Sequence, residues 1–118
     1  MPSPVAWNLQ VSLRPGQLDT FRTLMHEMVA STRAEPGAQA YDWFLSEDGS
    51  TCHILERYAD DDAAMVHIGT FGTTFAERFL GCAEPTALHV YGDPAPPVRA
   101  ALDGFGAVYF GALGGPLR

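Results

Sequence analysis

His67 is the side chain in this sequence best suited to acid–base chemistry. In the segment 60–69 (DDDAAMVHIG), Ala64, His67 and Ile68 share one face at the three- and four-residue spacing of a helix. We therefore expect the imidazole to point toward the core. With an unperturbed pKa of about 6.5, it could serve as base or acid at neutral pH. The alternative is a structural histidine whose hydrogen bonds are satisfied inside the protein.

Four aromatic side chains could line a small-molecule site between helices and a sheet, where such sites commonly form. They are Tyr41, Trp43, Phe71 and Phe75, and the same site could include Phe79 and Met65. Trp43 and Phe71 are the strongest candidates. For each of the four the alternative is ordinary burial in the core, which is the default role of aromatic residues.

Glu56 is a charged residue on an apolar side of a predicted strand. Within the segment 51–58 it alternates onto the same side as Cys52, Ile54 and Tyr58. A carboxylate in such a place needs a partner or a raised pKa. A structural ion pair is the favoured interpretation.

The sequence predicts neither a metal site nor a bound cofactor. Cys52 and His53 are neighbours on a strand, so they point to opposite faces and cannot close on one ion. The spacing of Cys52 and Cys82 fits neither a CxxC motif nor a disulfide framework, and we expect two reduced thiols. No GxGxxG or GxxxxGK(S/T) nucleotide-binding motif is present.

Composition favours a small apolar or aromatic substrate over larger charged partners. The 118 residues have a formal charge of -7 and include seven Lys and Arg, which leaves no basic surface for nucleic acid or for an anionic membrane. No apolar run of about 18 residues appears, and the start MPSPVAWN lacks the features of a signal peptide. We expect a cytoplasmic protein.

The order of predicted elements indicates an α+β domain over residues 1–92. Strands are expected at 5–13, 38–46, 51–58 and 86–91, and helices at 17–34, 60–69 and 74–81. Glu35-Pro36-Gly37 ends the first helix, Asp48-Gly49 forms a hairpin turn, and a capping box at Thr74 begins the third helix. This order is that of the ferredoxin-like split βαβ fold, an antiparallel sheet with helices on one face.

The second face of this sheet also needs a cover. Two predicted strands, 38–46 and 86–91, carry apolar residues on both sides, so we expect a second copy to pack there and form a homodimer. Residues 93–118 form a C-terminal arm with a stiff DPAPP linker, a short helix at 98–103 and a glycine-rich strand at 105–113. We expect the arm to dock on its own domain or on the partner subunit.

Three motifs resemble those of the antibiotic biosynthesis monooxygenase-like family, which belongs to the dimeric α+β barrel superfamily. They are Pro15-Gly16, Glu35-Pro36-Gly37 and Glu56-Arg57-Tyr58, and they occur in the family's order within residues 5–92. The resemblance implies a dimeric α+β barrel, a functional histidine at His67, and contact of Asn8 with substrate or oxygen. A second histidine that often follows five residues later is replaced here by Gly72.

The resemblance implies a cofactor-independent monooxygenase that oxidises a quinol or polycyclic phenol with molecular oxygen. His67 would be the base, and Asn8 and Trp43 would orient substrate or oxygen. For Asn8 the alternative is a polar residue at the sheet surface, because alternation places it opposite Trp7. A non-catalytic dimer that binds a small molecule is the alternative function. Haem degradation ranks last, because haem-degrading relatives carry tryptophan at the position of His67.

Overall fold

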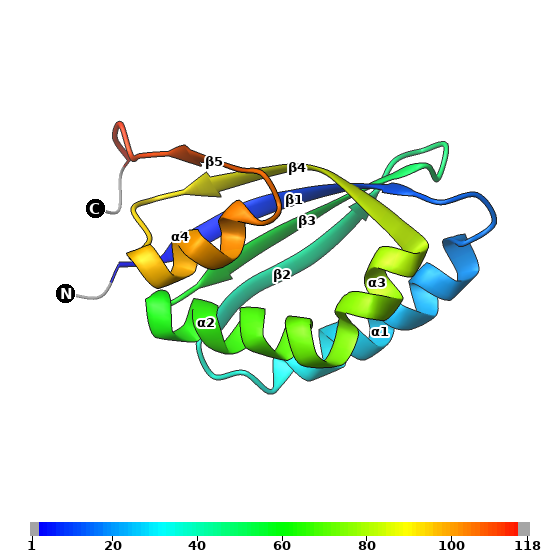
Figure 1. The fold of residues 1–118 in the computed structure, drawn as a ribbon, viewed down its shortest axis with the longest axis horizontal. Helices are drawn as coiled ribbons and strands as arrows, with labels where there is room; N and C mark the ends of the chain where they lie inside the picture. Colours follow the sequence, from blue (N-terminus) through cyan, green and yellow to red (C-terminus); the bar gives the residue numbers. More distant parts are fainter. Residues whose placement is uncertain (1–2, 116–118) are drawn as a thin grey trace.

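Within residues 3–115, which the computed structural model describes, helices cover one face of a five-stranded sheet (Figure 1). The strands are β1 (Val5–Leu13), β2 (Ala38–Leu45), β3 (Thr51–Tyr58), β4 (Ala83–Tyr91) and β5 (Ala107–Phe110). The helices are α1 (Leu18–Arg33), α2 (Asp61–Thr70), η1 (Phe71–Phe75), α3 (Ala76–Cys82) and α4 (Pro96–Asp103). In this part of the chain, no helix is long and apolar enough to span a membrane.

The strand order β2-β3-β1-β4-β5 confirms the predicted ferredoxin-like fold. β1 lies at the centre and pairs antiparallel with β3 and β4, so Trp7 is opposite Glu56 on one side and Val90 on the other. β2 pairs antiparallel with β3 and places Tyr41 opposite Glu56. β5 pairs in parallel with β4, and α4 provides the crossover connection that a parallel pair needs.

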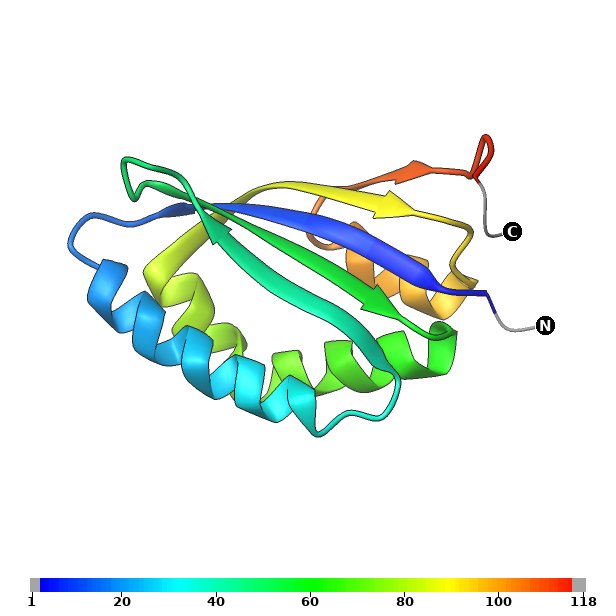
Figure 2. The ribbon, with the colours of Figure 1, turned by 180° about the vertical axis from the view of Figure 1, so that it is seen from behind.

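The two faces of the sheet differ in character. Figure 2 shows from behind that the helices all lie on the same side of the sheet. The face away from the helices, called here the open face, carries five large apolar side chains that are exposed in a single chain. They are Phe44, Leu55, Tyr91, Val108 and Phe110. This observation agrees with the expected need for a second cover.

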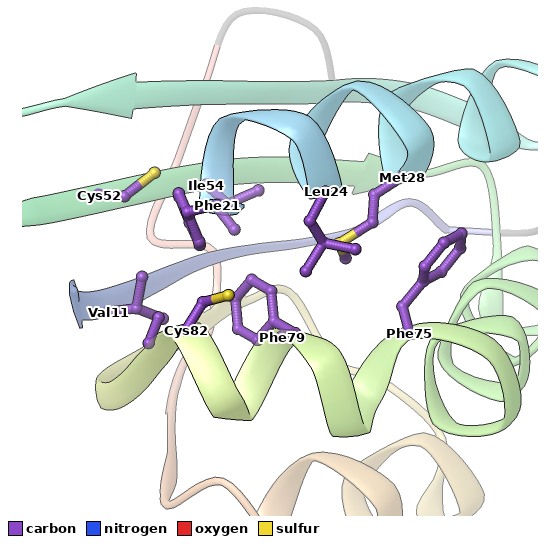
Figure 3. Close-up of a cluster of buried hydrophobic side chains, with 10 residues drawn as sticks. Val11, Phe21, Leu24, Met28, Cys52, Ile54, Phe75, Phe79 and Cys82 are labelled. Carbon is purple, nitrogen blue, oxygen red and sulfur yellow. The ribbon is translucent and has the colours of Figure 1, made fainter. Parts of the chain in front are cut away.

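The core consists of two clusters of buried side chains. In the first, Leu24 and Met28 of α1 face Phe75 and Phe79 beneath the sheet (Figure 3). The second cluster joins the sheet to α2 and α4, and it consists of Val5, Trp7, Tyr58, Ala64, Leu88, Val90, Val98 and Leu102. Because α4 contributes to this second cluster, the C-terminal arm is packed into the same core.

The predicted separate helix with a capping box at Thr74 was wrong. The chain stays helical from Asp61 to Cys82, because the π-helical turn η1 joins α2 to α3. The start of α3 has no side-chain cap, and the hydroxyl of the neighbouring Thr73 donates to the carbonyl of Gly69 at 3.0 Å, a bond typical of a helix interior. The true cap lies earlier, where the Asp60 side chain accepts from the Ala63 N–H at 2.8 Å.

Candidate functional site

His67 lies between two carboxylates contributed by different parts of the fold. Its Nδ1 is 3.2 Å from Oε1 of Glu35, in the turn after α1, and its Nε2 is 3.2 Å from Oε1 of Glu56 on β3. All three side chains are at least nine-tenths buried. The inward orientation expected from the helical spacing is confirmed, since His67 is 7% exposed.

The two carboxylates favour the charged form of the imidazole. Burial by itself disfavours the imidazolium, but the contacts with Glu56 and Glu35 outweigh burial and raise the pKa of His67. With an acceptor beside each ring nitrogen, the doubly protonated imidazolium is the form that satisfies both contacts. One cation and two carboxylates then give the cluster a formal charge of about −1.

Tyr58 and Glu56 form a second hydrogen bond at the same cluster. The Tyr58 hydroxyl donates to Oε1 of Glu56 at 2.7 Å, and burial together with the Glu56 charge raises the pKa of Tyr58. The Tyr58 ring also lies 4.8 Å from the His67 ring and 4.9 Å from the ring of Trp7. Glu56 thus has the partners that the strand pattern required, namely His67 and the Tyr58 hydroxyl.

Glu35 is a member of the cluster that the sequence did not single out. It stands in the Glu35-Pro36-Gly37 turn, and Gly37 packs so tightly on α2 that an added Cβ would collide with the Cβ of Ala63. The carbonyl of Gly37 also accepts from the N–H of Ala59 at 2.9 Å. Close packing of turn on helix brings Glu35 within reach of His67, one helical turn beyond Ala63.

A small apolar cavity of about 60 Å³ borders the cluster. Its polar lining consists of His67, Glu56 and the Tyr41 side chain. The remaining lining is apolar and comes from the sheet, the helices and the C-terminal arm: Trp7, Leu9, Met28, Ile54, Ile68, Phe71, Phe79, Leu88, Ala101, Leu102 and Phe105. An acid–base group at the edge of an apolar cavity is a common arrangement of ligand sites.

Two of the four predicted aromatic residues line the cavity. Tyr41 meets the His67 ring edge-on at 4.9 Å, and Phe71 belongs to the apolar wall. Trp43 lies outside the lining, against Phe21 and Phe79, and its indole N–H is buried with no acceptor among the described residues. Phe75 is part of the core against α1 (Figure 3).

Asn8 is not part of this cluster. It lies on β1 beside Leu55 and His89, on the open face, whereas Trp7 points to the cavity. Its Oδ1 is buried and accepts no hydrogen bond within the described part of the chain. The structure therefore places His67, Tyr41 and Phe71 together and leaves Asn8, Trp43 and Phe75 elsewhere.

Cys52 and His53 point to opposite faces of β3, as expected for neighbours on a strand. Burial raises the pKa of the Cys52 thiol to about 11, so it stays protonated at neutral pH. Among residues 3–115, no group of three or more His, Cys, Asp or Glu side chains is arranged to hold a metal ion.

Several solved structures share this fold. MupZ from Pseudomonas fluorescens superposes with a TM-score of 0.87 and 19% identity, over 100% of this chain and 91% of MupZ. SnoaB from Streptomyces nogalater, described as a cofactor-independent oxygenase, superposes with a TM-score of 0.67 and 13% identity, over 79% of this chain and 95% of SnoaB. These two likenesses concern the fold alone.

Sequence comparison adds a nearer relationship. Rv0793 from Mycobacterium tuberculosis, described as a candidate monooxygenase, is 37% identical over 70 residues, which are 59% of this chain and 69% of Rv0793. Residues 4–70 match the family described as antibiotic biosynthesis monooxygenase. The matched segment contains Glu35, Glu56 and His67 and ends before α4.

Proposed function

Because this chain belongs to the antibiotic biosynthesis monooxygenase family, we propose that it oxidises a quinol or a polycyclic phenol with molecular oxygen and without a bound cofactor. One observation carries the proposal: the buried Glu35–His67–Glu56 cluster supplies proton chemistry at the wall of an otherwise apolar cavity. The description of SnoaB as a cofactor-independent oxygenase supports the same class of reaction.

Proton removal is the first step of this reaction. The sequence predicts His67 alone as the base, but the contacts with Glu56 and Glu35 raise its pKa and favour the protonated imidazolium over the free base. In the proposal the substrate hydroxyl gives its proton to the Glu56 carboxylate, and the His67 imidazolium stabilises the phenolate that forms. Glu35 holds the second ring nitrogen and keeps the imidazole oriented and charged.

Electron transfer from the phenolate to oxygen follows. Conversion of a phenol into a quinone replaces one ring C–H and the phenolic O–H by two C=O groups and removes four electrons, which is what the complete reduction of O2 needs. One oxygen atom enters the product as the new carbonyl and the other leaves as water. The apolar walls of the cavity, including Phe71 and Trp7, shield the intermediates from solvent.

The placements of Asn8 and Trp43 do not support the roles expected for them. Asn8 lies on the open face, and Trp43 packs on Phe21 and Phe79 outside the cavity lining. Tyr41 is the better candidate for orienting a substrate, because its ring contacts His67 and lines the cavity. Phe71 is the candidate for contact with the apolar part of the substrate.

A homodimer is also part of the proposal. The exposed apolar side chains of the open face, such as Leu55 and Phe110, would be buried if a second copy packed sheet against sheet. The two-fold arrangement would complete the dimeric α+β barrel that the family resemblance implies. The catalytic cluster lies on the other face of the sheet, so each subunit would carry its own site.

Oxygen uptake tests the proposed function. We expect metal-stripped protein to consume oxygen with at least one member of a panel of hydroquinones and polycyclic phenols. His67→Ala should lose this activity, by about a hundredfold or more if proton transfer limits the rate. Leu113→Ala serves as the matched control, because Leu113 is fully exposed and does not line the cavity. Equal uptake by wild type and His67→Ala would contradict the assignment.

A non-catalytic binding protein is the second candidate function. The observation that favours it is the fully satisfied ion-pair cluster, which is also what a purely structural histidine requires. Ligand binding without oxygen uptake across the panel would support this candidate. Haem degradation is disfavoured, because both nitrogens of His67 are occupied by carboxylates and a cavity of about 60 Å³ is far smaller than a porphyrin.

A further inference from the structure

We infer that the C-terminal arm determines which ligands enter the cavity, and that Phe105 and Ala101 set the limit at a single aromatic ring. The arm begins at residue 93 and contains α4, the turn that follows it, and β5. This inference rests on the proposed function for the chemical class of the ligand. It adds a size limit that favours a quinol over a polycyclic phenol.

The arm is a fixed wall of the core and is anchored at both ends. At its start, the N–H of Ala95 donates to Oδ1 of Asp61 on α2 at 3.0 Å. In its middle, Val98 and Leu102 are buried in the second core cluster. At its end, β5 pairs with β4, and the Tyr109 hydroxyl donates to Oδ1 of Asp103 at 2.6 Å.

Three residues of this arm line the cavity: Ala101, Leu102 and Phe105. The Phe105 ring lies 6.2 Å from the ring of Phe71, so the arm meets η1 across the apolar wall. Figure 1 shows α4 above α2 on the helix-bearing side of the sheet. Without the arm, this side of the cavity would be open to solvent.

The volume of the cavity limits the size of the ligand that it can hold. A cavity of about 150 Å³ lined by apolar side chains can hold one benzene ring. The cavity here measures about 60 Å³, so even a single ring needs one lining side chain to move. A fused system of two or three rings needs several to move at once, which costs packing energy in a dense core.

Phe105 is the lining side chain best placed to move. It is half-buried, whereas its neighbour Leu102 is 4% exposed. It also stands in the turn between α4 and β5, next to Gly106, whose φ of 74° favours glycine at that position. A rotation of the Phe105 ring makes room for one ring of a ligand and leaves the anchors of the arm intact.

Binding measured without oxygen tests this inference apart from turnover. The probes are hydroquinone, 1,4-dihydroxynaphthalene and 9,10-dihydroxyanthracene, titrated anaerobically by calorimetry. We expect the wild type to bind hydroquinone at least tenfold more tightly than the three-ring compound. Phe105→Ala should reduce this preference by about tenfold or more, which corresponds to about 1.4 kcal/mol.

A second variant makes the cavity smaller, whereas Phe105→Ala makes it larger. Ala101→Leu adds volume to the wall and should weaken the binding of all three compounds, most of all the three-ring compound. Leu113→Ala lies in the same arm, is fully exposed and should bind like the wild type. Melting temperatures of the three variants show that each is folded.

Two results would overturn the inference. One is an unchanged ratio of affinities in folded Phe105→Ala and Ala101→Leu; the other is wild-type protein that binds the three-ring compound as tightly as hydroquinone. Failure of the proposed function gives a different pattern. In that case the size limit and its response to the variants persist, but no oxygen is consumed with any of the three compounds.

Discussion

A histidine held between two carboxylates binds its proton more tightly in the folded chain than in the unfolded chain. The pKa of His67 is raised above its unfolded value of about 6.5 by Glu56 and Glu35 against the opposing effect of burial. The folded state therefore binds more protons between these two pKa values, and its stability must fall as the pH rises through that window. Below about pH 6.5 the full contribution of the cluster is present.

The pH dependence of stability checks this linkage. We expect the free energy of unfolding, measured with urea, to decrease from pH 6.5 upward and to level off above the folded pKa of His67. His67→Gln should remove this decrease, and Glu35→Gln should reduce it because one of the two carboxylate charges is lost. Glu47→Gln, on the exposed hairpin, is the matched control. A decrease of equal size in His67→Gln would show that other groups cause it.

At the scale of elements, the Glu35-Pro36-Gly37 turn controls the position of Glu35 beside His67. A methyl group on Gly37 would collide with Ala63, so Gly37→Ala must push the turn away from α2. We expect a loss of about 1–3 kcal/mol in the free energy of unfolding. The pKa of His67 should also fall, because Glu35 moves with the turn.

Gly81→Ala is the matched control for this prediction. An added Cβ at Gly81 meets nothing within 4 Å, and the residue lies within helix α3. The substitution should therefore be neutral or stabilising, by up to about 1 kcal/mol. Urea unfolding and a histidine NMR titration together measure both effects. Unaltered stability of Gly37→Ala would contradict the tight packing of turn on helix.

Periodicity in the sequence predicted most elements and the inward side of each. The alternation along β3 and the helical spacing around His67 correctly placed Glu56 and His67 in the interior. Periodicity could not reveal Glu35, because its partner is 32 residues away and the contact depends on how a turn packs on a helix. The π-helical turn at Phe71–Phe75 was missed for a related reason: local capping residues do not show whether a helix continues through them.

At the scale of the whole molecule, the open face is the feature that needs a partner. Leu55 lies near the middle of this face and is 42% exposed in the single chain. We expect the wild type to be a dimer by light scattering at micromolar concentration, and Leu55→Asp to be a monomer, because a buried unpaired carboxylate is costly. Val66→Asp, an equally drastic change on α2, should remain a dimer.

The ligand site does not depend on the outcome of that experiment. A monomeric wild type would contradict the homodimer, while the cavity and its cluster would stand, because they lie on the other face of the sheet.

The volume of the cavity could not be predicted from the sequence. It depends on Phe105 and Ala101, which reach the site through an arm that sequence patterns could define only as a helix and a strand that dock somewhere.

The central position of β1 affects how this protein folds during its synthesis on the ribosome. β1 precedes β3 and β4 in the chain and pairs with both, so Trp7 lacks a neighbour on one side until Val90 has been synthesised. Until then an apolar strand is exposed and prone to wrong pairing. Contacts of such long sequence separation also slow folding, since the chain must close large loops first. The cavity therefore cannot form until synthesis has passed Phe105, which lines it.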